Sequence, residues 1–238
     1  VFPGATPEET RKRLDDTAAG KATGKIYDGL LFRHWDTWAD GRRKHIFVMP
    51  ASGGAPVDVM KDMDADAPSK PFGGRGEYTF TPDSRAIVFG ARNAGREEAW
   101  STNFDLFVAP ADGSAAPRNL TSANPAWDAH PAFSPDGRTL AYTAMKRPGY
   151  EADRFRIVLR AWPEGTERVL TESWDRSAGD LAWSDDGKTL FTTSDDLGNH
   201  ALFAIDVASG KVRTVVGKGH VVSPQVNGKH LVYLLDTL

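Results

Sequence analysis

The chain has 238 residues with 29 basic and 32 acidic side chains, a formal net charge of −3 and no cysteine. This charge balance offers no positive field for nucleic acid, and the lack of thiols excludes disulfides and thiolate metal sites. No apolar run approaches the roughly 18 residues that a membrane-spanning helix needs, so we expect neither nucleic acid nor a membrane as a partner.

The first predicted element is a short helix near the N-terminus. Thr6 suits the N-cap, Pro7 the first turn, and Glu9 the capping-box position from which a carboxylate reaches back to the N-cap. We expect the helix over residues 7–18, and it is the only helix that the sequence predicts.

Residues 24–60 are expected to form the back of a first β-sheet unit. Apolar and aromatic runs at 30–35 and 45–48 are separated by turn residues at 39–42, which predicts that a hairpin joins them. A Gly-rich turn then leads to a further short strand at 57–59.

The middle of the chain repeats one short phrase, in which an aromatic residue precedes Ser or Thr, then Pro or Asp, then Asp and Gly or Ser. The copies stand at 80–84, 133–137 and 183–187. Spacings of 53 and 50 residues are typical of a repeat architecture, and the turn chemistry predicts a hairpin in each copy. A third strand and a short fourth strand follow, the fourth ending in Leu-Thr in two of the copies. Four antiparallel strands per repeat predict β-propeller blades at 77–121, 128–171 and 178–216.

A further blade is expected to open at 220–238, where two apolar runs bracket an Asn-Gly turn. Because no change of composition marks a linker, residues 1–238 are interpreted as one all-β domain, a partial propeller with one helix. An ordinary β-sandwich is the alternative, but it would not repeat the phrase in register.

The sequence carries little catalytic signal. No serine has glycine at both i−2 and i+2, which excludes the nucleophile elbow of an α/β-hydrolase. The histidines never stand at metal-binding spacing, and the acidic run at 62–66 lacks the glycine and glutamate of a calcium loop. We therefore expect no catalytic residue, no metal and no cofactor in this chain.

Two loops, at 92–103 and 146–154, are longer than strand pairing needs, and long loops often carry function. Both hold carboxylates beside aromatic rings, a combination that suits a bound ammonium group. A solvated rim with internal ion pairs is the alternative for any one of these residues. The candidate substrate-binding residues are Glu97, Glu98, Trp100, Tyr150, Glu151 and Arg154.

Three phrases, at 27–38, 147–154 and 170–176, resemble the propeller of the prolyl oligopeptidase family. The most similar branch is that of the bacterial dipeptidyl aminopeptidases and acylaminoacyl peptidases, and the resemblance covers nearly the whole chain. It implies a seven-bladed propeller that caps an α/β-hydrolase domain with a Ser-Asp-His triad. This sequence departs from that pattern, since it lacks the hydrolase domain and is expected to begin after the first two blades.

The resemblance implies that the parent protein is a bacterial serine exopeptidase, periplasmic or cytoplasmic, that releases dipeptides or acyl-amino acids from short peptides. This chain would then gate access and anchor the substrate N-terminus. Its partners would be the peptide substrate, its own α/β-hydrolase domain and the missing blades. The alternative is a TolB-like propeller without enzymatic activity that mediates protein–protein interaction.

Glu151 is the first candidate for the anchor, followed by Glu97 and Glu98, each as a carboxylate that accepts from the substrate ammonium. Arg154 is expected to bind a substrate carbonyl. Tyr150 and Trp100 are expected to form apolar walls.

Overall fold

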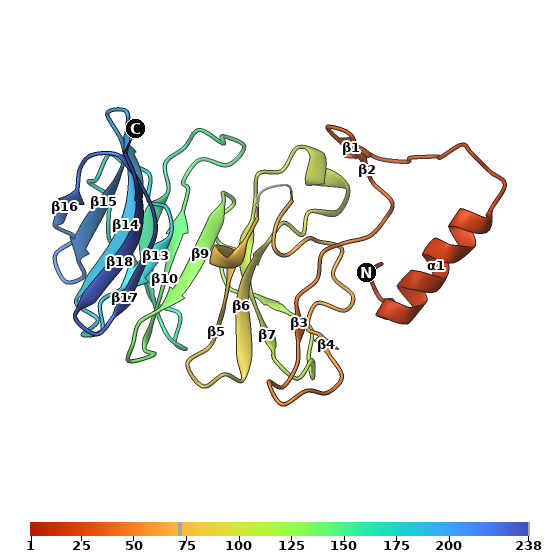
Figure 1. Ribbon diagram of the computed structural model, residues 1–238, viewed down its shortest axis with the longest axis horizontal. Helices are drawn as coiled ribbons and strands as arrows, with labels where there is room; N and C mark the ends of the chain where they lie inside the picture. Colours follow the sequence, from red (N-terminus) through yellow and green to blue (C-terminus); the bar gives the residue numbers. More distant parts are fainter. Residues whose placement is uncertain (71–72, 238) are drawn as a thin grey trace.

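Antiparallel sheets lie side by side in the computed structural model, which describes residues 1–70 and 73–237 (Figure 1). The first four-stranded sheet holds β5 Tyr78–Phe80, β6 Ala86–Ala91, β7 Asp105–Pro110 and β8 Arg118–Asn119. The second holds β9 Asp128–Phe133, β10 Thr139–Ala144, β11 Arg156–Ala161 and β12 Glu167–Val169. The third holds β13 Leu181–Trp183, β14 Thr189–Asp196, β15 Asn199–Asp206 and β16 Val212–Val216, joined by β17 His220–Asn227 and β18 His230–Asp236. The prediction of four-stranded propeller blades is confirmed.

The repeated phrase forms the same hydrogen-bonded turn between the first and second strands of each sheet. A hydroxyl donates to the carboxylate two residues later and accepts a backbone N–H five residues later, and the carboxylate accepts a second backbone N–H. The hydroxyl-to-carboxylate distances are 2.7 Å for Thr81 to Asp83, 2.6 Å for Ser134 to Asp136 and 2.7 Å for Ser184 to Asp186. These donors, the hydroxyl foremost, hold the pKa of each of the three carboxyls below its usual value.

The Leu-Thr ending of the fourth strand also has a repeated role. The Thr121 hydroxyl accepts from the backbone N–H of Leu106 at 3.0 Å, and the Thr171 hydroxyl accepts from that of Ile157 at 2.8 Å. Each threonine is buried, so its hydroxyl satisfies a backbone donor that would otherwise lack a partner. The fourth strand is thereby tied to the third at the same position in two sheets.

The core consists of apolar side chains from the second and third strands, packed between neighbouring sheets. Val88, Leu106, Leu140, Tyr142 and Val158 lie between the first and second sheets. Ala141, Ile157, Leu159, Leu190 and Ile205 lie between the second and third. Strand β9 contacts both β5 and β13, and β13 contacts β17, so the first strands of successive sheets face one another as the inner strands of a propeller do.

The N-terminal helix α1 spans Pro7–Ala19. The Thr6 hydroxyl accepts from the backbone N–H of Glu9, and the Glu9 carboxylate accepts from that of Thr6, which completes the predicted capping box. Only Thr10 of the helix is buried, and the helix lies at the end of the molecule opposite β17 and β18 (Figure 1). Within the described residues it is the only α-helix, beside the short 3-10 helices η1 Arg75–Glu77 and η2 Gly95–Ala99, and no helix there is long and apolar enough to cross a membrane.

The prediction that a hairpin is joined across residues 39–42 is wrong. Instead, β1 Arg33–His34 pairs with β2 Thr37–Trp38, and β3 Phe47–Val48 pairs with β4 Val57–Asp58, in two separate two-stranded sheets. Side chains at 30–42 stay exposed, so no packed face holds a longer strand there, and an isolated hairpin is only marginally stable. The second pair forms where a buried cluster meets the first sheet. That cluster contains Ile46, Val59, Met60, Phe89 and Phe107.

The last two strands form a hairpin at the outer end of the third sheet. β17 pairs with β18, and it joins β15 through one parallel pair, His200 with His220. β18 leaves three apolar side chains largely exposed, with exposed fractions of 61% for Val232, 64% for Leu234 and 47% for Leu235. The last residue of the unit expected at 220–238, Leu238, lies outside the described residues.

Candidate functional site

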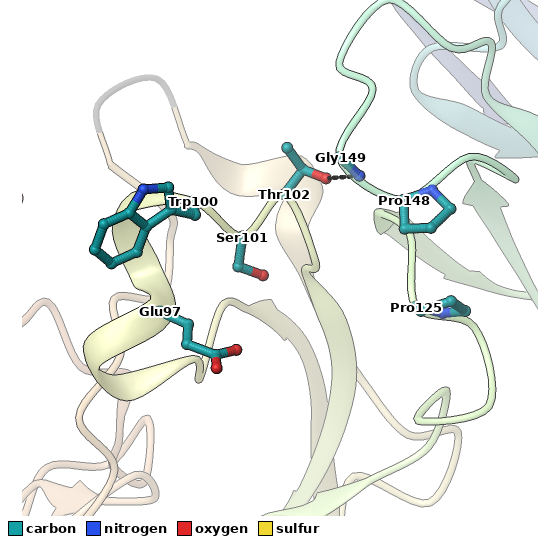
Figure 2. Close-up of a pocket in the computed structure, with 7 residues that line it drawn as sticks. All are labelled: Glu97, Trp100, Ser101, Thr102, Pro125, Pro148 and Gly149. Carbon is teal, nitrogen blue, oxygen red and sulfur yellow. Dashed lines mark hydrogen bonds between the residues drawn. The ribbon is translucent and has the colours of Figure 1, made fainter.

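A cavity of about 610 Å³ lies between the two long loops. The β6–β7 loop contributes Glu97, Trp100, Ser101 and Thr102, the β10–β11 loop contributes Pro148 and Gly149, and the β8–β9 connection contributes Pro125 (Figure 2). The backbone N–H of Gly149 donates to the Thr102 hydroxyl at 2.9 Å and links the two loops directly. The cavity is therefore shared by two neighbouring blades.

The β6–β7 loop is shaped by the single turn η2. Gly95 begins it at φ +52°, and the backbone N–H groups of Trp100 and Ser101 both donate to the carbonyl of Glu97, at 2.9 and 2.8 Å. In Figure 2 the Glu97 carboxylate is directed toward the side of the cavity that holds Pro125, whereas the Trp100 indole is directed away from Pro148. The indole is 70% exposed.

The structure separates Glu97 from Glu98. Both carboxylate oxygens of Glu98 accept from the guanidinium of Arg43, at 3.1 and 2.7 Å, and Glu98 does not line the cavity. In the described part of the chain, no hydrogen bond or ion pair engages the carboxylate of Glu97. Of the two adjacent acids, only Glu97 is available to a ligand in the cavity.

The β10–β11 loop is closed by the carboxylate of Asp153. It accepts from the backbone N–H groups of Lys146 and Arg147, both at 2.8 Å. Partial burial alone would raise the pKa of Asp153, but these donors outweigh it and the pKa is lowered. At the loop tip Gly149 has φ +70°, which a residue with a side chain rarely adopts.

The other three candidates of this loop lie outside the lining of the cavity. Tyr150 and Glu151 are exposed next to Gly149, and the guanidinium of Arg147 covers the Tyr150 ring at 3.8 Å from its centroid. Arg154 is directed to the connection between the second and third sheets. Its guanidinium donates to the backbone oxygens of Thr171, Glu172 and Trp174, at 3.1, 2.6 and 2.6 Å.

A row of aromatic rings joins the roots of the two loops. Phe104 stacks on Trp127 at 4.5 Å between centroids, Trp127 meets Phe155 edge-on at 5.7 Å, and Phe155 meets His130 at 6.1 Å. Phe104 follows the first loop and Phe155 follows the second. Such ring pairs add stability beyond area burial, so the loops are fixed where they rejoin the sheets at β7 and β11.

A buried carboxyl begins strand β9, close in sequence to Pro125. Asp128 is fully buried; one of its oxygens accepts from the Asn124 amide at 2.8 Å, and the other is buried without a partner among the described residues. Burial raises the pKa of Asp128 to about 8, and the negative charge of Asp105 adds to the shift. No group of three or more histidine or acidic side chains in the described residues is arranged to hold a metal ion.

Several lining residues gave no sequence signal as site residues. Pro125 lies in a connection of ordinary length without charge, and Ser101 and Thr102 resemble any polar loop residues. Pro148 and Gly149 belong to a phrase noted for its family resemblance, but nothing local set them apart from Tyr150 and Glu151. Which of these residues lie together around the cavity depends on how the two blades pack against each other.

Sequence comparison relates the chain to peptidases. Dipeptidyl-peptidase 5 of Porphyromonas gingivalis is 28% identical over 204 residues, which is 84% of this chain. Dipeptidyl-peptidase 5 of Trichophyton schoenleinii is 30% identical over 226 residues, covering 86% of this chain. The chain spans only 30% and 31% of the lengths of these relatives. No protein-family model matches the chain.

Solved structures share the fold. TolB of Acinetobacter baumannii matches 64% of this chain and 36% of its own, with a TM-score of 0.50 and 24% identity. A puromycin-hydrolysing peptidase of Mycobacterium tuberculosis matches 74% of this chain and 28% of its own, with a TM-score of 0.53 and 17% identity. At these identities the matches establish the propeller fold and nothing finer.

Proposed function

We propose that this chain gates and positions peptides for a serine peptidase domain outside this sequence, because it is similar over most of its length to part of dipeptidyl-peptidase 5 from two organisms and resembles the propeller of the prolyl oligopeptidase family. Bond cleavage would belong to that domain, and this chain would hold the substrate N-terminus. One observation carries the proposal: the carboxylate of Glu97, which has no partner among the described residues, is directed into a cavity that two long loops share.

The chemistry of the cavity suits the free amino end of a peptide. A protonated amine would donate to the Glu97 carboxylate, and a charge-assisted bond of this kind is worth about 1.5 to 3 kcal/mol. Pro125 and Pro148 supply apolar surface on the other side for the first side chain of the peptide. Anchoring one end in this way fixes how far the chain of the substrate extends toward a catalytic domain.

The remaining candidates take different roles in this proposal. Glu151 stands two residues after Gly149 and is a second anchor, placed at the rim instead of in the cavity. Trp100 lines the cavity as part of its wall, and Tyr150 forms exposed apolar surface beside it. Arg154 and Glu98 keep the surrounding segments in place.

The test is binding of alanyl-alanine amide and of its N-acetylated form to the full chain, measured by NMR titration. Glu97→Gln keeps the shape and removes the charge, so we expect the free-amine probe to bind roughly ten- to a hundredfold more weakly and the acetylated probe to be unaffected. Glu164→Gln, an exposed glutamate in the β11–β12 turn, is the matched control and should bind as the parent chain does.

Equal loss for both probes would mean that Glu97 shapes the loop and contacts no amine. If only Glu151→Gln weakens binding of the free amine, the anchor lies at the rim. If neither probe binds at any site, the gating function is wrong and a TolB-like role in binding protein partners becomes the better explanation.

A further inference from the structure

The ion pair between Arg43 and Glu98 connects two parts of the chain that are 55 residues apart in sequence. The two terminal nitrogens of the guanidinium, Nη1 and Nη2, donate to the two carboxylate oxygens at 3.1 and 2.7 Å, in the two-pronged geometry that holds a carboxylate most rigidly. The two side chains are only 19% and 18% exposed, so water screens the attraction less than it would at the surface.

Arg43 is itself held from several directions. Its guanidinium also donates to Asp64 at 2.7 Å and to Asp66 at 3.1 Å, and its backbone N–H donates to the carbonyl of Val1 at 2.7 Å. Asp66 is buried and also forms an ion pair with Lys70 at 2.8 Å. A side chain fixed at this many points acts as a rigid support for the group that it binds.

Glu98 lies in η2, immediately after the residue that faces the cavity. Since adjacent side chains of a single helical turn leave it in different directions, fixing the carboxylate of Glu98 against Arg43 also fixes the direction of Glu97. Among the described residues, η2 has one other side-chain hydrogen bond to a segment outside its own loop, from Arg96 to the carbonyl of Asp28 at 3.5 Å, and both residues are exposed.

From this geometry we propose that Arg43 is a positioning residue for the cavity, which acts through Glu98 and never touches the ligand. The inference rests on the function proposed above and adds what determines affinity there. The alternative is that Glu98 itself receives the amine once Arg43 releases it. The two hypotheses predict opposite changes in the affinity for the amine. Loss of the Arg43 side chain would weaken binding in the first case and strengthen it in the second.

The first measurement is hydrogen exchange at the backbone amides of Glu97, Trp100 and Ser101, whose bonds close η2. In the full chain, Arg43→Gln and Glu98→Gln are each expected to speed this exchange about tenfold or more, because each removes the two-pronged bond that ties η2 to Arg43. The ion pair that Glu98 keeps in Arg43→Gln, with Arg92 at 3.7 Å, comes from the same loop and does not tie η2 to another segment. Arg42→Gln is the matched control. Arg42 pairs with Asp40, and both side chains are considerably exposed, 47% and 34%, so exchange in η2 should not change.

The second measurement is affinity for alanyl-alanine amide in the same variants. Arg43→Gln and Glu98→Gln should each weaken it about tenfold, and Arg43→Lys, which keeps the charge but not the fork, should recover part of the loss. Amide protection in β10 reports whether the sheets remain folded. If Arg43→Gln unfolds the chain, Glu98→Gln supplies the same comparison.

Unchanged exchange in η2, or affinity that stays equal or rises in Arg43→Gln, would overturn the inference. The proposed function fails separately: it falls if Glu97→Gln binds the probe as well as the parent chain does. In that event, faster exchange of η2 in Arg43→Gln would still show that Arg43 holds this turn in place. Unchanged exchange would still refute that role of Arg43.

Discussion

Glu97 and Glu98 show how far a single residue can be assigned from sequence. The pair was recognisable as a carboxylate cluster in a long loop, but the two side chains do different work because one meets Arg43 and the other faces a cavity. The partner that distinguishes them is 55 residues away in sequence, beyond the reach of any local pattern. The same holds for Arg154, whose bonds to three backbone carbonyls depend on the fold of the next connection.

Asp128 gives a residue-scale prediction about pH. Its folded pKa of about 8 lies above the unfolded value of 3.8, so the folded chain binds more protons between these limits, and the free energy of unfolding falls as the pH rises through that window. Asp128→Asn keeps the size and the bond from Asn124 but cannot ionise. We expect the variant to be more stable than the parent chain at pH 8, by about 1 to 3 kcal/mol, with a smaller difference at pH 5.

Urea unfolding across pH 5 to 8 measures this difference. Asp15→Asn, a change at an exposed acid on α1, is the control and should leave the pH dependence as it is. A variant whose stability falls as steeply with pH as that of the parent chain would show that another group causes the slope.

Among the elements, the second strand of each blade was predictable because an apolar run follows a turn with a defined hydrogen-bonding role. The third strand was predictable because a further apolar run recurs in each repeat. The segment at 24–60 was not, because its apolar and aromatic residues resemble strands but have no sheet to cover them at 30–42. Strand propensity expresses fit to a half-buried pleated surface, and it fails where that surface is missing. The long loops were recognisable by length, whereas the residues that meet across them were not.

The repeated turn gives an element-scale prediction. Asp186→Ala removes the acceptor of the Ser184 hydroxyl and of one backbone N–H, so we expect a lower unfolding temperature, while the same change at the neighbouring exposed Asp185 should have little effect. Because the folded pKa of Asp186 is lowered, its stabilisation exists above the unfolded pKa and is lost as pH falls through the folded value. Thermal melts at pH 7 and below pH 4 should therefore show the two variants converging in acid. A gap that persists in acid would argue against the carboxylate as the source.

At the scale of the whole molecule, β18 is an open edge. In the described residues no strand pairs with its far side, and its side chains Val232, Leu234 and Leu235 expose apolar surface. Unpaired edges with exposed apolar side chains recruit other chains. The chain is therefore expected to self-associate at micromolar concentration.

Sedimentation velocity tests this expectation. Leu234→Lys should shift the population toward monomer, since it places a charge on the open face. Leu197→Lys, at the exposed β14–β15 turn, is the matched control for loss of an isolated apolar side chain and should not change the distribution. A parent chain that sediments as a monomer throughout would mean that β18 is protected in solution.

The repeated turns have a consequence for how such a protein can evolve. In each blade the turn that fixes strand register joins the first strand to the second, and the long loops at 92–103 and 146–154 lie at the opposite end, between the second and third strands. Insertions or substitutions in the loops leave the register undisturbed, because the bonds that set it span at most five residues at the other end. Mutations can therefore change which ligands bind at one end of the blade without disturbing the strand pairing. Duplicated blades can diverge in their loops while the turns stay alike.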